Sequence, residues 1–277
     1  MARTTRPSWD IAVPDRPGAL PGLMMAGFSD RAAGLRNLQL IPHPSVTLAF
    51  NLGDAPLSVH DGTGQRSCER LVVGLAPGTV RAAGERGFAC LQLRLSPLLA
   101  HAVLGAPCGP YGETVDLDAL WGRAAAERLQ DRLRAAASWP ERFAVAERAL
   151  ALRAEEGRAL SPEVSYAWRR LAACHGRVRV ERLAHETGWS RKRLWSRFRT
   201  QVGLTPQHAA RLVRFDRAAH RLAAGAPPSR VAAESGYADQ SHLHRDVRAF
   251  TGATPSAVAG TPFLAVDDVA WAAEGGH

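Results

Sequence analysis

Short apolar stretches separated by turn residues fill the first third of the chain. Six stretches have the length and composition of β-strands, at residues 23–28, 36–41, 46–52, 57–60, 70–75 and 88–95. In the last of these, LQLRL alternates apolar and polar positions, as a strand with one buried face does. Turn residues separate the stretches, among them Gly53-Asp54, Asp61-Gly62 and Pro77-Gly78. This spacing predicts a small antiparallel β-barrel or sandwich.

Helical periodicity takes over after Ser96-Pro97, where proline suits a first helical position. Two amphipathic helices are predicted over 117–136 and 140–155, and from Pro162 onward the pattern is again helical. The predicted fold class is therefore α+β with two domains. The predicted division is a leader over 1–20, a barrel-like domain with a helical hairpin over 21–155, a linker over 156–163, an all-α domain over 164–260 and a tail over 261–277.

The all-α region contains one short plan written twice. In the first copy, Gly188 follows a predicted helix and Ser190 precedes the next one; Gly236 and Asp239 hold the matching positions of the second copy. Each copy then ends on Gly-x-Thr-Pro. Glycine at positive φ turns the chain, Ser or Asp caps the following helix, and Thr-Pro starts another. The plan is that of a DNA-binding helix-turn-helix.

The second helix of each copy has two different faces. In the first copy, Leu194, Phe198 and Val202 recur at helical spacing and are predicted to pack inward. The outer face changes between copies and is rich in hydrogen-bond donors: Arg191, Lys192, Trp195, Ser196 and Arg199 in the first, Gln240, Ser241, His244, Arg245 and Arg248 in the second. A constant skeleton with variable donors suits the reading of two base sequences. Ordinary hairpins with solvated faces are the alternative, and the matched glycines, caps and Thr-Pro starts disfavour it.

The segment between the copies, residues 206–224, is predicted to be one helix. Nineteen residues would make a rod of roughly 28 Å. Major-groove faces on one side of B-DNA recur about every 34 Å. Such a rod would place two reading helices in adjacent turns of one duplex, with some bending of the DNA.

The positive charge is confined to the region that contains the two copies. The chain has a net charge of +9, and residues 161–260 hold 17 Lys and Arg against 7 Asp and Glu, whereas the rest of the chain is nearly neutral. A neutral domain joined to a basic one indicates that the basic part meets a polyanion.

Signals for other functions are weak. The four cysteines, Cys68, Cys90, Cys108 and Cys174, lack the spacing of disulfide or zinc frameworks, and the histidines of the first domain lack a ligand pattern, so no metal or cofactor is predicted. Neither a nucleophile elbow nor a phosphate-binding glycine loop is present, so an enzyme is not predicted. The chain has no apolar run near the roughly 18 residues of a membrane span and no secretion-signal core, which predicts a cytoplasmic protein.

Residues 164–260 resemble the DNA-binding domain of the AraC/XylS family of bacterial transcription regulators. The resemblance rests on LAHETGWSRKRLWSRFRTQVGLTP, on the connecting RLVRFDRAAHRLAAG and on VAAESGYADQSHLHRDVRAFTGATPSAV. It implies base-reading positions at Lys192, Trp195, Ser196, Ser241, His244 and Arg245. Two residues depart from the family pattern: Ser196 stands where many members carry arginine, and Val247 where phenylalanine is usual.

The N-terminal part is similar to the small-barrel domains of a poorly characterised subgroup of these regulators, on VTLAFNLGDAPLSV and LQLRLSPLLAHAVLG. In the family such a domain binds a small effector or mediates dimerisation. The resemblance does not decide between these two roles, nor between an activator and a repressor. The expected partner is double-stranded DNA, and RNA polymerase, a small-molecule effector and a second copy of the chain are open candidates; membrane attachment is not expected. An architectural or repair-type DNA-binding protein without small-molecule sensing is the alternative. Alternation offers inward-facing Phe50, Leu91 and Leu93 as candidates for effector contacts, but core packing is the preferred explanation of these residues.

Overall fold

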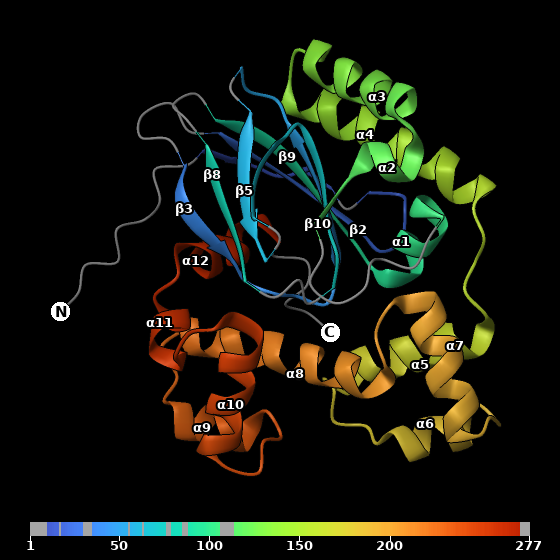
Figure 1. Cartoon of the computed structure of the whole chain (residues 1–277), viewed down its shortest axis with the longest axis vertical. Coiled ribbons are helices and arrows are strands. Elements are labelled where there is room, and N and C mark those ends of the chain that lie inside the picture. Colours follow the sequence, from blue (N-terminus) through green and yellow to red (C-terminus); the bar gives the residue numbers. More distant parts are fainter. Residues whose placement is uncertain are drawn as a thin grey trace.

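The computed structural model of the chain describes residues 10–16, 18–29, 35–54, 56–62, 64–75, 79–84, 88–105 and 114–271. Residues 1–9 of the predicted leader, 272–277 of the predicted tail, Cys108 and the Pro77-Gly78 turn lie outside the described residues. Two sheets with flanking helices form the upper part of Figure 1, and a layer of helices lies below them.

All strand pairs of the upper part are antiparallel. The larger sheet has the order β1-β2-β9-β4-β7-β10, with bounds Asp10–Ala12, Leu23–Ser29, Ala89–Leu95, Val46–Asn51, Arg70–Val73 and Thr114–Asp116. The smaller sheet has the order β3-β8-β5-β6, with bounds Leu35–Leu40, Val80–Gly84, Leu57–Asp61 and Gly64–Cys68. The sequence predicted a barrel or a sandwich; the described strands form two separate sheets, which is the sandwich, and do not close into one barrel.

The six predicted strands are all present as β2, β3, β4, β5, β7 and β9. Strands β1, β6, β8 and β10 were not predicted. Three-residue β1 and β10 are too short to show a period, and β6 has the polar sequence GQRSC on an exposed edge. Such strands exist because a neighbour offers backbone partners, which local composition does not reveal.

Four helices cover the larger sheet: α1 (Pro97–Leu104), α2 (Leu117–Trp121), α3 (Arg123–Ala135) and α4 (Trp139–Glu156). The predicted helix over 117–136 is split at Gly122, whose φ of 77° interrupts the helical backbone. Helix α4 packs directly on β2, since a Cβ at Gly27 would lie 2.3 Å from the Trp139 ring. Only glycine fits at this contact.

The remaining helices are α5 (Pro162–Ala173), α6 (Val180–Glu186), α7 (Arg191–Val202), α8 (Pro206–Ala223), α9 (Pro228–Glu234), α10 (Gln240–Thr251), α11 (Pro255–Ala259) and α12 (Pro262–Ala270). The two predicted helix-turn-helix units are α6–α7 and α9–α10, and α8 connects them as one helix, as predicted. Helix α12 was not predicted and lies in the segment expected to be a tail.

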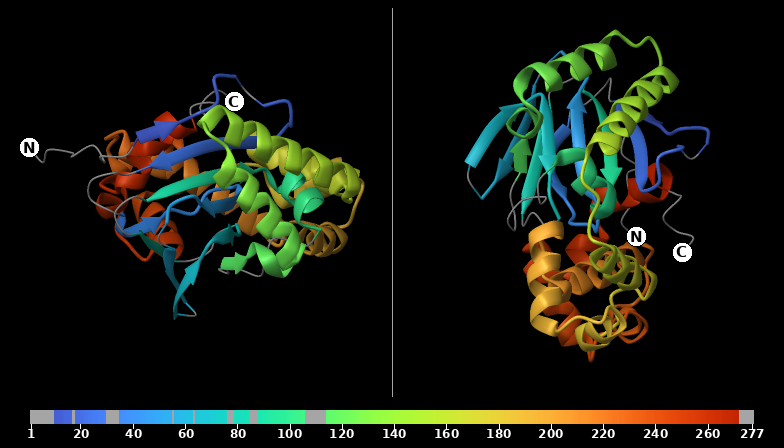
Figure 2. Two further views of the ribbon diagram at one scale, coloured as in Figure 1. Left: turned by 90° about the horizontal axis from the view of Figure 1, so that it is seen from above. Right: turned by 90° about the vertical axis from the view of Figure 1, so that its right-hand side faces the viewer.

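The sheet part and the helical part share one core. A continuous cluster of buried side chains runs from the larger sheet through α1 and α4 into α7, α8 and α10. Figure 2 shows the sheets stacked directly above the helical layer, with α12 between them. The sheet domain is therefore packed against the helix-turn-helix units, not tethered to them by a linker alone.

Candidate functional site

The first helix-turn-helix unit has the local geometry that its sequence predicts. Gly188 turns the chain at φ 67°, and the Ser190 side chain caps α7 by accepting a hydrogen bond from the Arg193 amide at 3.2 Å. Leu194, Phe198 and Val202 are buried. Burial of this face points the opposite face of α7 away from the core.

The second unit repeats the geometry. Gly236 has φ 78°, and Asp239 accepts a hydrogen bond from the His242 amide at 2.7 Å. Val247, the departure from the family pattern, is fully buried. Phe250, one turn further along α10, stacks on Phe215 of α8 with ring centroids 4.8 Å apart. This aromatic contact packs α10 against α8.

Every predicted reading residue is exposed: Arg191, Lys192, Trp195, Ser196 and Arg199 on α7, and Gln240, Ser241, His244, Arg245 and Arg248 on α10. Trp195 is 45% exposed, which is unusual for a large apolar ring, and the Arg199 guanidinium lies 5.2 Å from its centroid. On α10, the Gln240 amide lies 3.3 Å from His244 Nε2. These side chains are accessible to a partner surface, although Arg191 also pairs with Glu181 at 3.2 Å.

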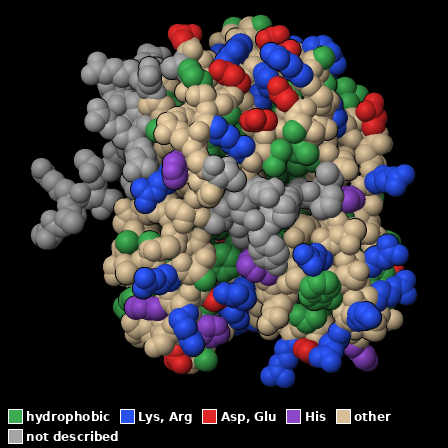
Figure 3. Space-filling view, viewed as in Figure 1, with side chains coloured by type: hydrophobic (Ala, Val, Ile, Leu, Met, Phe, Trp, Pro, Cys, Tyr) green, Lys and Arg blue, Asp and Glu red, His purple; other side chains and the backbone are tan. Residues whose placement is uncertain are grey.

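A basic groove of about 750 Å³ separates the two units. Arg191, Lys192 and Trp195 of α7 form one side of it, α8 forms the floor, and His242 of α10 reaches the other side. Six of its lining residues are cationic and one is acidic: Arg177, Arg179, Arg191, Lys192, Arg211 and Arg214 against Glu181. Figure 3 shows Lys and Arg with few Asp or Glu beside them over the lower, helical part, whereas those of the upper part are interspersed with Asp and Glu. Such a concentration of positive charge attracts a polyanion.

Sequence reasoning did not assign Arg177, Arg179, Arg211 and Arg214 to the site. The charge excess of residues 161–260 was the available signal, but it does not say which arginines share a surface. Ser196, Arg199 and the five predicted residues of α10 are not part of the groove lining. Of the predicted reading residues, the groove is therefore lined only by Arg191, Lys192 and Trp195, near the start of α7.

The floor of the groove is braced to α10. The carboxylate of Asp246, 5% exposed, lies 2.8 Å from Arg211 and 3.6 Å from Arg214. Arg214 in turn lies 4.8 Å from the centroid of the Tyr237 ring. These contacts fix the second unit to the connecting helix.

Hydrogen bonds from outside the two units hold the C-terminal ends of α7 and α10, one from the sheet domain and one from Ser161, which precedes α5. Gln39 of β3 donates a hydrogen bond at 2.7 Å to the carbonyl of Thr251, the last residue of α10. Near the end of α7, Gln201 Oε1 accepts hydrogen bonds from the Ser161 amide and hydroxyl at 3.0 and 3.2 Å. Both units thus have a polar anchor outside the helix-turn-helix motif.

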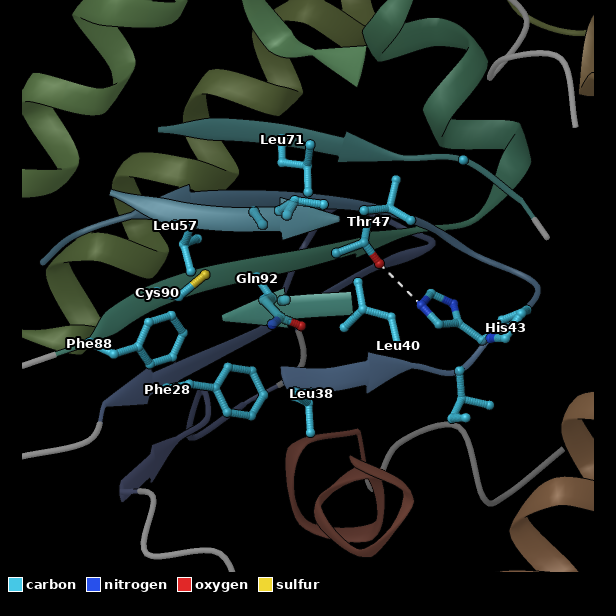
Figure 4. A pocket seen from close by; sticks show the side chains of 17 residues that line it. Phe28, Leu38, Leu40, His43, Thr47, Leu57, Leu71, Phe88, Cys90 and Gln92 are labelled. Atoms are coloured by element: carbon cyan, nitrogen blue, oxygen red, sulfur yellow. Dashed lines mark hydrogen bonds between the residues drawn. The ribbon is translucent and has the colours of Figure 1, made fainter. Parts of the chain in front are cut away.

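The sheet domain contains an apolar pocket of about 60 Å³ between its two sheets (Figure 4). Its walls include Phe28, Leu38, Leu40, Leu57, Leu71 and Phe88, and its polar members include His43, Thr47, Cys90 and Gln92. On β9 the pocket side belongs to Cys90 and Gln92, whereas the effector candidates Leu91 and Leu93, with Phe50 of β4, are buried in the main core cluster. The positions of Phe50, Leu91 and Leu93 thus agree with their interpretation as core residues.

The polar groups of the pocket carry no formal charge. His43 Nδ1 accepts a hydrogen bond from the Ser45 amide at 3.3 Å, so its Nε2 carries the proton and donates to Thr47 Oγ1 at 3.1 Å. Burial, together with nearby Arg94, holds the pKa of His43 well below its usual value. Burial raises the pKa of Cys90 to about 12, so this thiol stays protonated at neutral pH. An uncharged apolar molecule matches this lining.

Neither a metal site nor a membrane-spanning helix is found in the described part of the chain. No group of three or more His, Cys, Asp or Glu side chains there could hold a metal ion. Cys68, Cys90 and Cys174 are free thiols. No helix there combines the length and the apolar character required to cross a bilayer.

Comparison with known proteins gives one family match and several distant structural neighbours. Residues 183–260 match a family model described as a helix-turn-helix domain. ToxT from Vibrio cholerae O395 aligns over 88% of this chain and 98% of its own, with 10% identity and a TM-score of 0.49. The AraC-like transcriptional activator CuxR aligns over 76% of this chain and 88% of its own, with 13% identity and a TM-score of 0.31. The C-terminal domain of AraT, a response regulator from Geobacillus stearothermophilus, covers 36% of this chain and 85% of its own, with 21% identity and a TM-score of 0.34. No curated protein sequence matches the chain.

Proposed function

We propose that this chain, whose C-terminal part is a helix-turn-helix domain of the AraC type, is a sequence-specific transcription regulator that reads two adjacent major grooves of DNA. The observation that carries the proposal is the pair of helices α7 and α10, which share one buried skeleton but expose different donor-rich faces. A basic groove lies between them. Base edges in a major groove are recognised by such donors, and phosphates by such cations.

The connecting helix sets the distance between the two reading helices. Helix α8 has 18 residues, which corresponds to about 27 Å. This is shorter than the roughly 34 Å between successive major grooves on one side of a duplex. The duplex would therefore bend toward the protein, at a cost of a few kcal/mol that the phosphate contacts of the groove offset.

The two kinds of contact have separate tasks. Arginines of the groove, such as Arg177 and Arg179, neutralise phosphates and supply affinity that depends on salt. The exposed faces of α7 and α10 select the sequence, with Lys192, Trp195 and Ser196 in one groove and Ser241, His244 and Arg245 in the next. Contact with RNA polymerase and a homodimer remain predictions from the family resemblance, and the absence of catalysis remains a prediction from the lack of catalytic motifs in the sequence.

Selection of bound duplexes from a random pool tests the proposal. The purified chain should enrich a bipartite sequence whose halves are centred about 10–11 base pairs apart, because one turn of B-DNA separates the two grooves. Substitution of exposed residues on α7 should alter one half and substitution on α10 the other. Enrichment of bent or A·T-rich DNA without a bipartite sequence would favour the alternative, an architectural binder.

We further propose that the regulator responds to an uncharged apolar effector held in the pocket of the sheet domain. The support is the apolar lining with neutral His43, Thr47 and Gln92 as its polar members. Thermal unfolding of the chain with a panel of neutral aromatic and aliphatic compounds tests this, because a ligand that binds only the native state raises the midpoint. Enlarging Ala49 of the lining to Phe should abolish the shift. A shift that persists in this variant would place the ligand elsewhere.

A further inference from the structure

Helix α12 lies outside the matched helix-turn-helix domain and occupies the boundary between the two parts of the molecule. The domain match ends at residue 260, and α12 begins at Pro262. It contacts α8 on one side and strands β1 and β3 on the other. In Figure 1 it lies directly below the sheets and above the helical layer. A segment in this place connects the two parts by its own side chains.

One carboxylate of α12 joins both parts through ion pairs. Asp267 Oδ1 accepts a hydrogen bond from Arg94 of β9 at 2.9 Å, and its Oδ2 lies 3.2 Å from Nε2 of His220 on α8. Arg94 is 1% exposed and Asp267 is 6% exposed. Trp271, just after α12, places its ring centroid 4.3 Å from the Arg94 guanidinium. A buried carboxylate with two cations from different domains is a specific tie between them.

The surroundings of His220 require the charged imidazolium. Its Nδ1 faces the Asp216 carbonyl at 2.8 Å and its Nε2 faces Asp267, so both nitrogens point at acceptors and both must donate. Burial alone would lower the pKa of His220, but the hydrogen bond to Asp267 and the nearby Asp216 raise it to about 9. At neutral pH, Arg94, Asp267 and His220 therefore form one connected group of charges, and the Asp216 carboxylate lies 3.7 Å from His220 Nδ1 beside it.

The same helix supports the wall of the apolar pocket. Val266, Ala270 and Trp271 pack in one cluster with Phe28, and Phe88 borders this cluster. Phe28 and Phe88 also line the pocket. Figure 4 shows α12 just beyond Leu38 and Phe28. The present pocket of about 60 Å³ has room for only a few waters, so a larger occupant must push this wall outward, toward α12.

We infer that α12 is a clasp that ties the pocket wall of the sheet domain to helix α8, and that expansion of the pocket releases it. The inference rests on the pocket of the proposed function but not on DNA binding. Separation of one charge from the set leaves a buried ion without a partner, which is strongly unfavourable, whereas full release returns all three groups to water. The clasp therefore has two discrete states, closed and released, as a switching element requires.

The test compares the full chain with Asp267→Asn, which breaks both ties, and with His220→Ala, which breaks only the tie to α8 and leaves the Arg94 pair intact. The matched control is Asp118→Asn, because Asp118 pairs with Arg70 at 2.8 and 3.0 Å inside the sheet domain. Two quantities are measured in each protein: amide hydrogen exchange of residues 216–224, and the dissociation constant of the neutral fluorescent probe N-phenyl-1-naphthylamine.

Faster exchange of residues 216–224 in Asp267→Asn and His220→Ala, but not in Asp118→Asn, is the expected result. The probe should bind Asp267→Asn about fivefold or more tightly than the unsubstituted chain, because release of the clasp and filling of the pocket are linked. Saturation of the unsubstituted chain with probe should likewise accelerate exchange in α8.

Unchanged exchange of α8 in both clasp variants would overturn the inference, as would equal acceleration in Asp118→Asn. Equal probe affinity in the unsubstituted chain and Asp267→Asn would also overturn it. If the probe binds neither protein, the pocket proposal fails. Accelerated exchange in the variants would then show that the clasp ties the domains but is not controlled by a ligand, which contradicts the inferred release. If Asp267→Asn does not fold, His220→Ala decides, since His220 is partly exposed and its loss leaves no buried ion alone.

Discussion

At the scale of single residues, the capping and turn positions were predicted from the sequence because each depends on its immediate neighbours. Ser190, Asp239 and the positive φ of Gly188 and Gly236 follow from local backbone chemistry. The partners of Arg94, Asp267 and His220 were not predicted. They are 47 or more positions apart in the chain, and only the packing of three separate elements brings them together.

Arg245 on the exposed face of α10 is expected to read a base. Its replacement by alanine should reduce discrimination by about 1–3 kcal/mol at one base pair of the selected sequence, because a donor pair to a base edge is lost. Binding of Arg245→Ala to single-base variants of that sequence measures the effect. A uniform loss of affinity across all variants would instead identify a phosphate contact.

The charge of His220 makes part of the stability depend on pH. The pKa of His220 is raised in the folded state to about 9 from an ordinary value of 6.5. Its contribution is therefore complete below about pH 6.5 and is lost as pH rises from there through 9. The pKa of nearby His43 lies well below this window, so its titration does not overlap.

The unfolding midpoint of the chain should accordingly fall between pH 6.5 and 9 by more than that of His220→Ala. Despite its burial, Asp267 has a pKa that is lowered by nearby Arg94 and His220, so Asp267 stays ionised across this range and the difference between the two proteins isolates the imidazolium. Parallel pH profiles would show that His220 is not held by the clasp.

At the scale of elements, the helix-turn-helix units could be predicted from the sequence because their pattern occurs twice. Two copies with the same glycines, caps and Thr-Pro starts constrain each other, whereas one copy is a weak pattern. Thr261-Pro262 repeats the start signal that precedes α8 and α11, and it was available as a sign of α12. The short strands β6 and β10 offered no such signal, because only their pairing partners define them.

Gly188, inside the first unit, and Gly176, in the turn that precedes it, differ in what surrounds them. Gly188 has φ 67° and open space where a Cβ would lie, so Gly188→Ala adds only backbone strain of about 1–2 kcal/mol. Gly176 has φ 70°, and its Cβ would lie 2.1 Å from the Ala210 carbonyl oxygen of α8. Gly176→Ala should therefore lower the free energy of unfolding by more than Gly188→Ala does, as urea titration would measure. Equal losses would mean that the 176–178 turn can move away from α8.

At the scale of the whole molecule, the charge asymmetry was predicted and the arrangement of the two parts was not. The sequence places the basic excess in residues 161–260. It gives no sign that the sheet domain contacts α7, α8 and α10 directly, since these contacts join residues such as Gln39 and Thr251 that lie far apart in the chain. Shape complementarity between folded surfaces decides such contacts.

The basic groove should govern the salt dependence of DNA binding. Arg177→Ala and Arg179→Ala are each expected to make the slope of log affinity against log salt concentration shallower by about 1, without changing sequence preference. Arg123→Ala is the matched control, because Arg123 is 82% exposed on α3 of the sheet domain, outside the groove. A control as damaging as the groove variants would mean that overall charge, and not the groove, sets the slope.

Consecutive residues of strand β3 contact the apolar pocket and helix α10. Leu38 and Leu40 face the pocket, and Gln39 between them holds the last carbonyl of α10. A shift of this strand would be passed to α10 through that hydrogen bond, whereas the corresponding hydrogen bond of α7, at Gln201, comes from Ser161. If α7 and α10 each bind one half of an operator as proposed, occupation of the pocket would affect the two halves unequally. One chain would then stay bound to the α7 half-site while it dissociates from the α10 half-site.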